Sequence, residues 1–417
     1  MAKQTLIFDA SVIASNLNNG RGRSGIYFAT YNILKNLVAS GEIDVSLYSD
    51  YFSDKFNEFV RQNFGDVPIY YGNRYVKFLS RMVQLDKKLR EKRHNVLKLL
   101  LNIFVRKPAK FIGSWGRLPY FDAAFSPIYV FPKKIRAKEK YIILYDAIPI
   151  LFPLYYETHR SKAHFWFEVL TKYIKTKPKC RYFAISESCR DDFIRLLDMK
   201  EDDITVMPLA AGDNFYQEKD EDKIRATRAK YNIPADKKYV FSLCTLEPRK
   251  NLIRAVKTFI EFIKKNKIDD MVFVLGGAHW DDFIGKLESE IDDLGKYKTR
   301  IIRAGYIDDA DLTALYSGAT FFVYTSQYEG FGLPPLEAMQ CGCPVITSNT
   351  SSLPEVVGDA AIMIDWDDDA AHIAAYERYY NDKELRNEMR KRGLARAKQF
   401  TWENTADIIV EKIKADK

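Results

Sequence analysis

Two glutamates, Glu329 and Glu337, lie eight residues apart in the stretch YEGFGLPPLEAMQCGCPVITSN, around a Gly-Phe-Gly turn and a Pro-Pro pair. Glycine lets backbone amides approach a ligand closely, and proline suits the first position of a helix. We therefore expect Glu329 at a turn after a strand and Glu337 in the first turns of a helix, whose N-terminus favours anions. A carboxylate has two acceptor oxygens for a pair of hydroxyl groups, so one glutamate suits a sugar and the other a ribose. Taken alone, the motif also fits a capping turn with incidental acids.

A pair of cations, Arg249 and Lys250, follows the β-rich segment YVFSLCTL. Arginine grips two oxygens at once and lysine supplies a compact point charge, so the pair suits a diphosphate. An isolated Arg-Lys pair is more often a solvated turn. The expected position at the carboxyl end of a strand favours the ligand-binding interpretation, because ligands of open α/β sheets bind there.

Short β-rich segments alternate with helical patterns along the chain, which indicates parallel sheets covered by helices. The polar, charged segment 214–238 interrupts this alternation and marks a domain boundary. The prediction is an α/β protein with two Rossmann-like domains that face each other across a deep cleft. We expect an N-terminal domain at 1–212, a C-terminal domain at 213–400, and a terminal helix at 401–417 that can pack back on the N-terminal domain.

The chain has 417 residues, 47% of them hydrophobic, and a net charge of +8. The segment 81–117 alone carries a net charge of +9, with leucines and aromatic residues between the basic ones. Such a segment either lies on an anionic membrane surface or forms a solvated helix face over a core, and both interpretations stay open. We expect no binding to nucleic acid, because no motif for it is present.

The N-terminal residues resemble a first strand more than a secretion signal, and no apolar run reaches the length of about 20 residues that spans a membrane. Five cysteines without metal-type spacing indicate reduced thiols. We expect a cytoplasmic protein that can work at the inner face of a membrane. We interpret Cys341 and Cys343 as small buried residues rather than metal ligands.

The run from LEPRKN through GGAHW to GYIDDADLTALYSGATFFVYTSQYEGFGLPPLEAMQCGCPVITSNTSSLPEVVGDAA resembles the retaining glycosyltransferases of family 4, also called group 1. The resemblance covers nearly the whole chain and is strongest over 245–365. It implies the GT-B fold, with acceptor binding by the domain at 1–212 and nucleotide-sugar binding by the domain at 213–400. It also implies a nucleotide diphosphate sugar as the donor substrate and no metal cofactor.

The resemblance also implies roles for the motif residues. Glu329 is expected beside the donor sugar, Glu337 at the ribose, and Arg249 and Lys250 at the diphosphate as it leaves, where fixed charge stabilises the transition state. Backbone amides are expected to hold the sugar hydroxyls or the phosphate at four positions, namely Gly330, Phe331, Gly332 and Leu333.

The N-terminal half matches the family more loosely. In NNGRGRSGIYFATYN, the glycines Gly22 and Gly25 are expected to let the backbone approach phosphate or acceptor, although a flexible turn also fits. Asp146 follows the strand YIILYDAIP, where it can orient the acceptor hydroxyl or the sugar, with a simple turn residue as the alternative. Tyr145 stands where many family members have histidine. The segment ISESCRDDF also resembles a family segment, and Ser186 and Ser188 are expected to open a helix. Contact with the donor or acceptor is one interpretation of these serines, and N-capping is the simpler one.

The expected reaction is transfer of a hexose from a nucleotide diphosphate sugar to a hydroxyl of a glycan or lipid-linked acceptor in surface polysaccharide synthesis, with retention of configuration. Mannose from GDP-mannose is the best guess, while UDP- and dTDP-sugars are equally compatible with the residues. Two alternatives stay open: a sugar-nucleotide epimerase of the same fold, and a non-catalytic nucleotide-sugar binding protein. A dehydrogenase is disfavoured because the glycine cluster GRGRSG at 20–25 does not directly follow the first strand, as the dinucleotide-binding fingerprint does.

Overall fold

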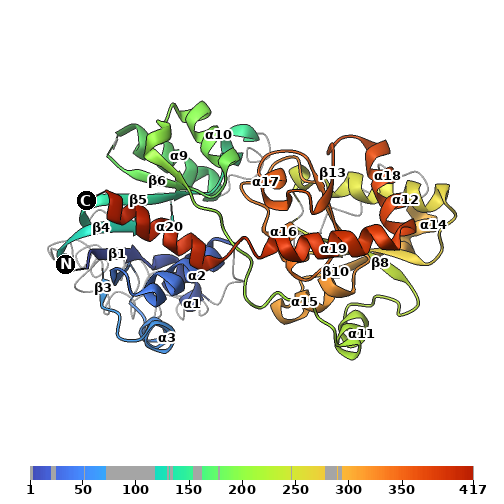
Figure 1. Cartoon of the computed structure of the whole chain (residues 1–417), viewed down its shortest axis with the longest axis horizontal. Helices are drawn as coiled ribbons and strands as arrows, with labels where there is room; N and C mark the ends of the chain where they lie inside the picture. The colour runs from blue at the N-terminus through green and yellow to red at the C-terminus, as the bar shows by residue number, and fades with distance from the viewer. Residues whose placement is uncertain are drawn as a thin grey trace, which may run out of the picture.

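The computed structural model shows two α/β domains side by side, joined by two passages of the chain (Figure 1). The basic segment 81–117 and Gly22 lie outside the residues that it describes. The described residues are 3–19, 25–50, 52–71, 118–128, 131, 135–153, 162–176, 179–245, 247–277, 289 and 294–416.

The N-terminal domain is built on a seven-stranded sheet with the order β3-β2-β1-β4-β5-β6-β7, in which every pair is parallel. The strands are β1 (Thr5–Asp9), β2 (Asp44–Ser49), β3 (Ile69–Tyr71), β4 (Tyr120–Ser126), β5 (Arg136–Leu144), β6 (Arg181–Ala184) and β7 (Ile204–Val206). Its helices include α1 (Ser11–Asn19), α2 (Gly25–Ser40), α3 (Asp54–Phe64), α7 (Ile148–Leu151), α9 (Lys162–Thr176) and α10 (Glu187–Leu197).

The C-terminal domain is built on a six-stranded parallel sheet with the order β10-β9-β8-β11-β12-β13. The strands are β8 (Lys238–Leu243), β9 (Met271–Gly276), β10 (Ile301–Gly305), β11 (Phe321–Tyr324), β12 (Val345–Ser348) and β13 (Ala361–Ile364). Its helices include α11 (Glu221–Lys230), α12 (Leu252–Lys265), α14 (Leu294–Tyr297), α15 (Asp309–Gly318), α16 (Leu333–Gln340), α17 (Leu353–Val357), α18 (Asp369–Asn381) and α19 (Lys383–Ala397).

The strands form where the sequence has short apolar runs, because a parallel sheet is covered by helices on both faces. All six residues of β9, MVFVLG, are buried. Helix α12 buries one face against this sheet, including Val256, Phe259 and Ile263, and it ends in the partly exposed Lys264 and the exposed Lys265. This pattern confirms the predicted α/β class.

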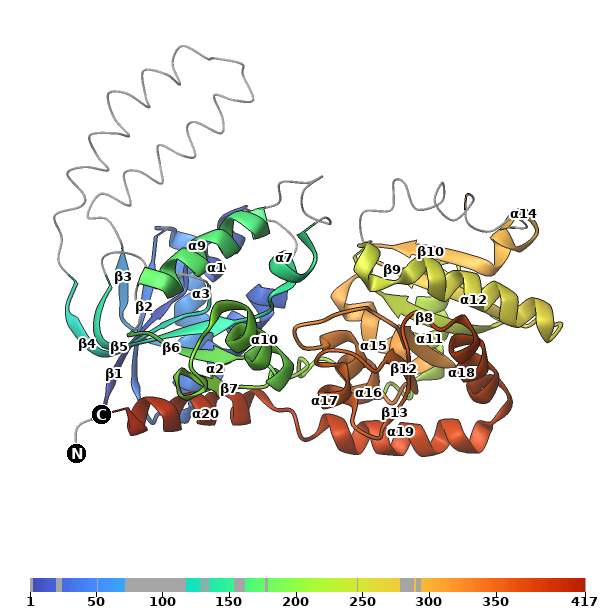
Figure 2. The same cartoon turned by 90° about the horizontal axis from the view of Figure 1, so that it is seen from above.

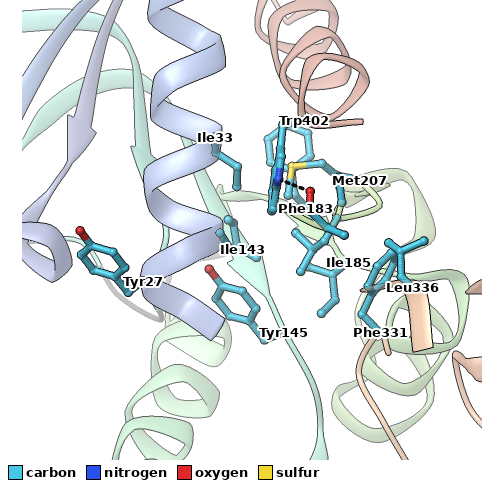
Figure 3. Packing of buried hydrophobic residues seen from close by; sticks show 14 of the residues in the cluster. Tyr27, Ile33, Ile143, Tyr145, Phe183, Ile185, Met207, Phe331, Leu336 and Trp402 are labelled. Carbon is cyan, nitrogen blue, oxygen red and sulfur yellow. Dashed lines mark hydrogen bonds between the residues drawn. The ribbon is translucent and has the colours of Figure 1, made fainter. Parts of the chain in front are cut away.

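The last helix, α20 (Trp402–Ala415), lies against α2 of the N-terminal domain, while α19 before it lies against the C-terminal domain (Figure 2). Trp402 Nε1 donates a hydrogen bond to the carbonyl of Ala211 at 3.0 Å. Thr405 Oγ1 donates to the carbonyl of Pro208 at 2.7 Å. Buried side chains continue across the boundary, from Phe183 and Met207 in one domain to Phe331 in the other (Figure 3).

Two further features bear on the site. Cys341 and Cys343 are buried beside α16, as small core residues. In the part of the chain that the structure describes, no helix is long and apolar enough to cross a bilayer, and no group of three or more His, Cys, Asp and Glu side chains is arranged to hold a metal ion.

Candidate active site

The carboxyl ends of two neighbouring strands bring Glu329, Arg249 and Lys250 together. Arg249 and Lys250 lie in a 3-10 turn after β8, and Glu329 lies after β11, which pairs with β8. Lys250 Nζ donates a hydrogen bond to Glu329 Oε1 at 2.6 Å, and Arg249 Nη1 lies 3.0 Å from the same oxygen. A carboxylate and two cations from distant parts of the chain thus form one cluster.

Tyr324, the last residue of β11, completes this cluster. Its hydroxyl accepts a hydrogen bond from Lys250 Nζ at 2.6 Å and donates one to Glu329 Oε1 at 3.0 Å. An ammonium has three N–H donors. Lys250 uses two of them for Tyr324 and Glu329. The sequence analysis missed Tyr324, although a polar aromatic at the carboxyl end of a buried strand is a usable signal.

The cluster holds its groups in the charged state. Burial raises the pKa of the Glu329 carboxyl, but the charges of Lys250 and Arg249 outweigh burial and lower that pKa to about 2. Burial likewise disfavours the Arg249 guanidinium, but the neighbouring Glu329 and Glu247 raise its pKa above the ordinary value. The Glu329 side chain is only 10% exposed, so these charges interact with little screening.

Asp146 brings the N-terminal domain to the same place. It follows β5, and its Oδ1 accepts a hydrogen bond from the amide of Ile148 at 3.1 Å. Burial raises the pKa of Asp146, whereas the Arg249 charge lowers it and the Glu329 charge raises it. Asp146 therefore lies within electrostatic reach of the cluster, across the boundary between the domains.

Gly330 is required by a close approach of the two domains. A Cβ at this position would overlap the carbonyl oxygen of Tyr145 and lie 3.0 Å from Asp146 Cβ. The carbonyl of Gly330 also accepts a hydrogen bond from Ser186 Oγ at 2.7 Å. The structure thus gives this glycine a packing reason in addition to the expected role of its amide, which stays a prediction.

The rest of the turn leads into α16, which begins at Leu333. Gly332 precedes the helix with φ of 121°, a conformation that favours glycine. Phe331 is buried, and its ring contacts that of Phe400 with centroids 5.8 Å apart. Ser352 Oγ lies 3.0 Å from the Glu329 carbonyl and 2.5 Å from the Phe331 carbonyl, so it fixes the turn. Pro334 and Pro335 carry no N–H, so Leu333 supplies the first amide of α16, and the amide of Leu336 donates to the carbonyl of Gly332 at 3.3 Å.

Glu337 lies in α16 and faces α15 rather than the cations. Its Oε2 accepts a hydrogen bond from Tyr316 Oη at 3.1 Å. Burial raises the pKa of Glu337 to about 7, with the Asp309 charge acting in the same direction and the Tyr316 hydrogen bond opposing it. The two glutamates of the motif therefore differ: Glu329 is ionised throughout the physiological range, and Glu337 changes its charge near neutrality.

The N-terminal glycine loop is only partly described. Gly25 begins α2, is exposed, and has nothing within 4 Å of the place that a Cβ would occupy. Steric crowding therefore does not require a glycine at position 25. The role of Gly25 in the approach of a ligand stays a prediction. Tyr145 is buried with Tyr27 and Ile143 near α2 (Figure 3). The predicted serine cap is Ser186, whose Oγ accepts a hydrogen bond from the amide of Cys189 at 3.0 Å.

Two facing Rossmann-like domains, with acids and cations gathered where they meet, define the GT-B class of fold. The comparisons with known proteins agree. The crystal structure of Anabaena HepE in complex with UDP and glucose aligns with a TM-score of 0.65 at 16% identity, covering 99% of this chain and 100% of that one. Residues 223–396 match the family of group 1 glycosyl transferases. This match covers less than half of the chain and lies in the C-terminal domain.

Two of the similar proteins come from Escherichia coli. O-antigen chain mannosyltransferase B is 36% identical over 221 residues, which are 53% of this chain and 57% of that protein. A serotype-specific mannosyltransferase, WbdA, is 28% identical over 270 residues, which are 64% of this chain and 32% of that protein. The aligned part thus spans about half of the first relative and a third of the second.

Proposed function

We propose that the chain is a retaining glycosyltransferase that moves a hexose from a nucleotide diphosphate sugar to a hydroxyl of a glycan or lipid-linked acceptor. The observation that carries this proposal is the contact of Lys250 and Arg249 with Glu329, opposite Asp146. Mannose from GDP-mannose is the favoured donor, because both E. coli relatives are named mannosyltransferases. The same names support surface polysaccharide as the product.

Each charged group has a place in this reaction. The bond between the anomeric carbon and the phosphate oxygen breaks, and negative charge grows on the leaving diphosphate. Arg249 and Lys250 stabilise that charge, because they are already fixed by Glu329 and Tyr324 and need no reorganisation. The acceptor oxygen bonds to the same face of the anomeric carbon, and its proton passes to the leaving phosphate.

The hydroxyl groups of the donor are assigned to the carboxylates. Glu329 Oε1 is occupied by its cations, so its other oxygen, Oε2, is the one assigned to a sugar hydroxyl. Glu337 takes the ribose hydroxyls, and Asp146 orients the acceptor hydroxyl or the sugar from the other domain. The amides of the turn from Gly330 to Leu333 complete the sugar and phosphate contacts. We expect no metal, because the two cations supply the positive charge.

The donor is tested first by binding. Thermal unfolding is followed with GDP, UDP and dTDP, since a ligand that binds only the native state raises its stability. We expect GDP to raise the Tm most, and a larger effect of UDP or dTDP would reassign the base. GDP-mannose is then incubated with and without acceptor glycans. Transfer of mannose supports the proposal, release of an epimerised sugar nucleotide without acceptor would favour an epimerase, and binding without turnover would favour a binding protein.

The role of Glu329 is tested by Glu329→Ala, with Glu384→Gln on the exposed start of α19 as the control. We expect turnover to fall by about a hundredfold or more, as for loss of an electrostatic group in a preorganised site, while the fold stays intact by circular dichroism. Full transfer rates on the true donor would contradict the assignment.

A contact with an anionic membrane through 81–117 is part of the proposal. The segment lies outside the described residues, and its support is its charge. Sedimentation with vesicles of anionic phospholipid at low salt is expected to carry the protein down, and high salt is expected to release it. Equal sedimentation with neutral vesicles would contradict an electrostatic contact.

A further inference from the structure

The carboxylate of Glu355 crosses from one domain to the other. Glu355 lies in α17 of the C-terminal domain, and its two oxygens accept hydrogen bonds from the backbone amides of Glu187 and Ser188, both at 2.7 Å. These amides are the first two of α10 in the N-terminal domain, and a helix has no acceptors of its own for them. A charged acceptor at the positive end of a helix makes a strong, directional contact.

The same helix has two further contacts with the C-terminal domain. Ser186, the N-cap of α10, donates its hydroxyl to the carbonyl of Gly330 at 2.7 Å. Tyr328 Oη donates to Asp192 Oδ2, on the second turn of α10, at 2.5 Å. Both Tyr328 and Gly330 adjoin Glu329. The start of α10 is therefore fastened to the turn that carries the candidate sugar-binding glutamate.

Helix α17 is itself braced against α19. The Arg396 guanidinium donates a hydrogen bond to the carbonyl of Glu355 and another, at 3.1 Å, to the carbonyl of Val356. A helix of five residues is too short to be stable alone. These contacts fix its direction, so the Glu355 carboxylate is presented to α10 by a rigid support rather than by a flexible loop.

We propose that Glu355 is a positioning residue, which holds the two domains in the arrangement that sets Asp146 against Glu329 and Lys250. The inference rests on the proposed transfer reaction. The side chains assigned to the nucleotide, Arg249, Lys250 and Glu337, all belong to the C-terminal domain, so their contacts with it do not need the bond between Glu355 and α10. The chemistry needs Asp146 from the other domain, and a small displacement of reacting groups is costly in rate.

The test uses Glu355→Gln in the full chain. Glutamine keeps the size of the side chain but loses the charge, and its NH₂ group faces one of the two amides without accepting from it. We expect kcat to fall by about tenfold or more, while the Kd for GDP changes by less than about twofold. Hydrogen exchange at the amides of Glu187 and Ser188, followed by mass spectrometry or NMR, is expected to become faster.

Glu384→Gln, on the exposed first turn of α19, is the matched control and is expected to leave all three measurements unchanged. A Glu355→Gln variant with wild-type kcat would overturn the positioning role. Unchanged exchange at the two amides would overturn the contact itself. A fall in GDP affinity parallel to kcat would show a general loss of structure instead. The exchange experiment needs no substrate. If the wild-type protein has no transfer activity, the proposed function is contradicted, but the contact of Glu355 with the two amides can still be tested.

Discussion

Replacing Glu337 by glutamine is expected to change how the stability of the protein depends on pH. Glu337 is partly buried, and desolvation of its carboxyl raises its pKa to about 7. A carboxyl whose pKa is higher in the folded state contributes stability that is fully present below its unfolded pKa of about 4.3 and is lost as the pH rises through the folded pKa. The difference between the two pKa values corresponds to about 4 kcal/mol.

The assay compares the free energy of unfolding of the wild type and Glu337→Gln in urea at about pH 5 and about pH 8. The wild type is expected to lose about 2 to 3 kcal/mol relative to the variant between these values, because only the wild type must ionise a buried carboxyl. All other groups titrate in both proteins, so the difference between the two curves isolates Glu337. Parallel curves, within about 0.5 kcal/mol, would refute the burial argument.

The same residue connects pH to ligand binding. Ribose hydroxyls donate to an ionised carboxylate, so GDP binding should favour the charged form of Glu337 and lower its pKa. At about pH 6.5 roughly three quarters of Glu337 is protonated in the free protein, so the wild type is expected to release up to about 0.8 more protons per GDP than Glu337→Gln, by calorimetry in buffers of different ionisation enthalpy. Equal release by both proteins would remove Glu337 from the ribose site.

Three other substitutions test the site and the domain contacts. Gly330→Ala is expected to lower both Tm and kcat, because the new methyl group overlaps the carbonyl of Tyr145; a wild-type Tm would contradict that close approach. Arg249→Ala is expected to weaken GDP binding by about tenfold or more, since a diphosphate loses a charge-assisted contact; an unchanged Kd by calorimetry would count against the assignment. Trp402→Ala is expected to lower the free energy of unfolding by about 3 to 5 kcal/mol. Trp402→Phe loses chiefly the hydrogen bond to Ala211 and is expected to lower it by about 1 kcal/mol. Equal losses for the two variants would contradict a packing role for the ring.

The sequence was sufficient for the fold class and for the central cluster. Apolar runs such as MVFVLG in β9 are typical of strands covered on both faces, and the structure buries all of that strand. Arg249, Lys250 and Glu329 converge because β8 and β11 are neighbours in the sheet. Periodicity alone does not specify that order of strands, and the resemblance to a known family supplied it.

The contacts between the domains were beyond sequence reasoning. Gly330 has a special need for glycine because of Tyr145, which belongs to the other domain, and Glu355 caps a helix of that same domain. Such contacts depend on how two finished surfaces dock, which no local pattern encodes. The opposite pKa shifts of Glu329 and Glu337 have the same origin, since both depend on neighbours brought from distant elements.

The return of α20 to the N-terminal domain constrains how the molecule can move. The polypeptide passes between the domains once before α11 and again before α20, and the Trp402–Ala211 hydrogen bond ties these two passages together (Figure 1). Two backbone crossings at one point form a hinge. They permit rotation of one domain relative to the other about that point and resist translation or separation of the domains. In a hinge rotation, the atoms farthest from the hinge move the most. Substrate entry and product exit are therefore expected on the side of the domain boundary opposite α20.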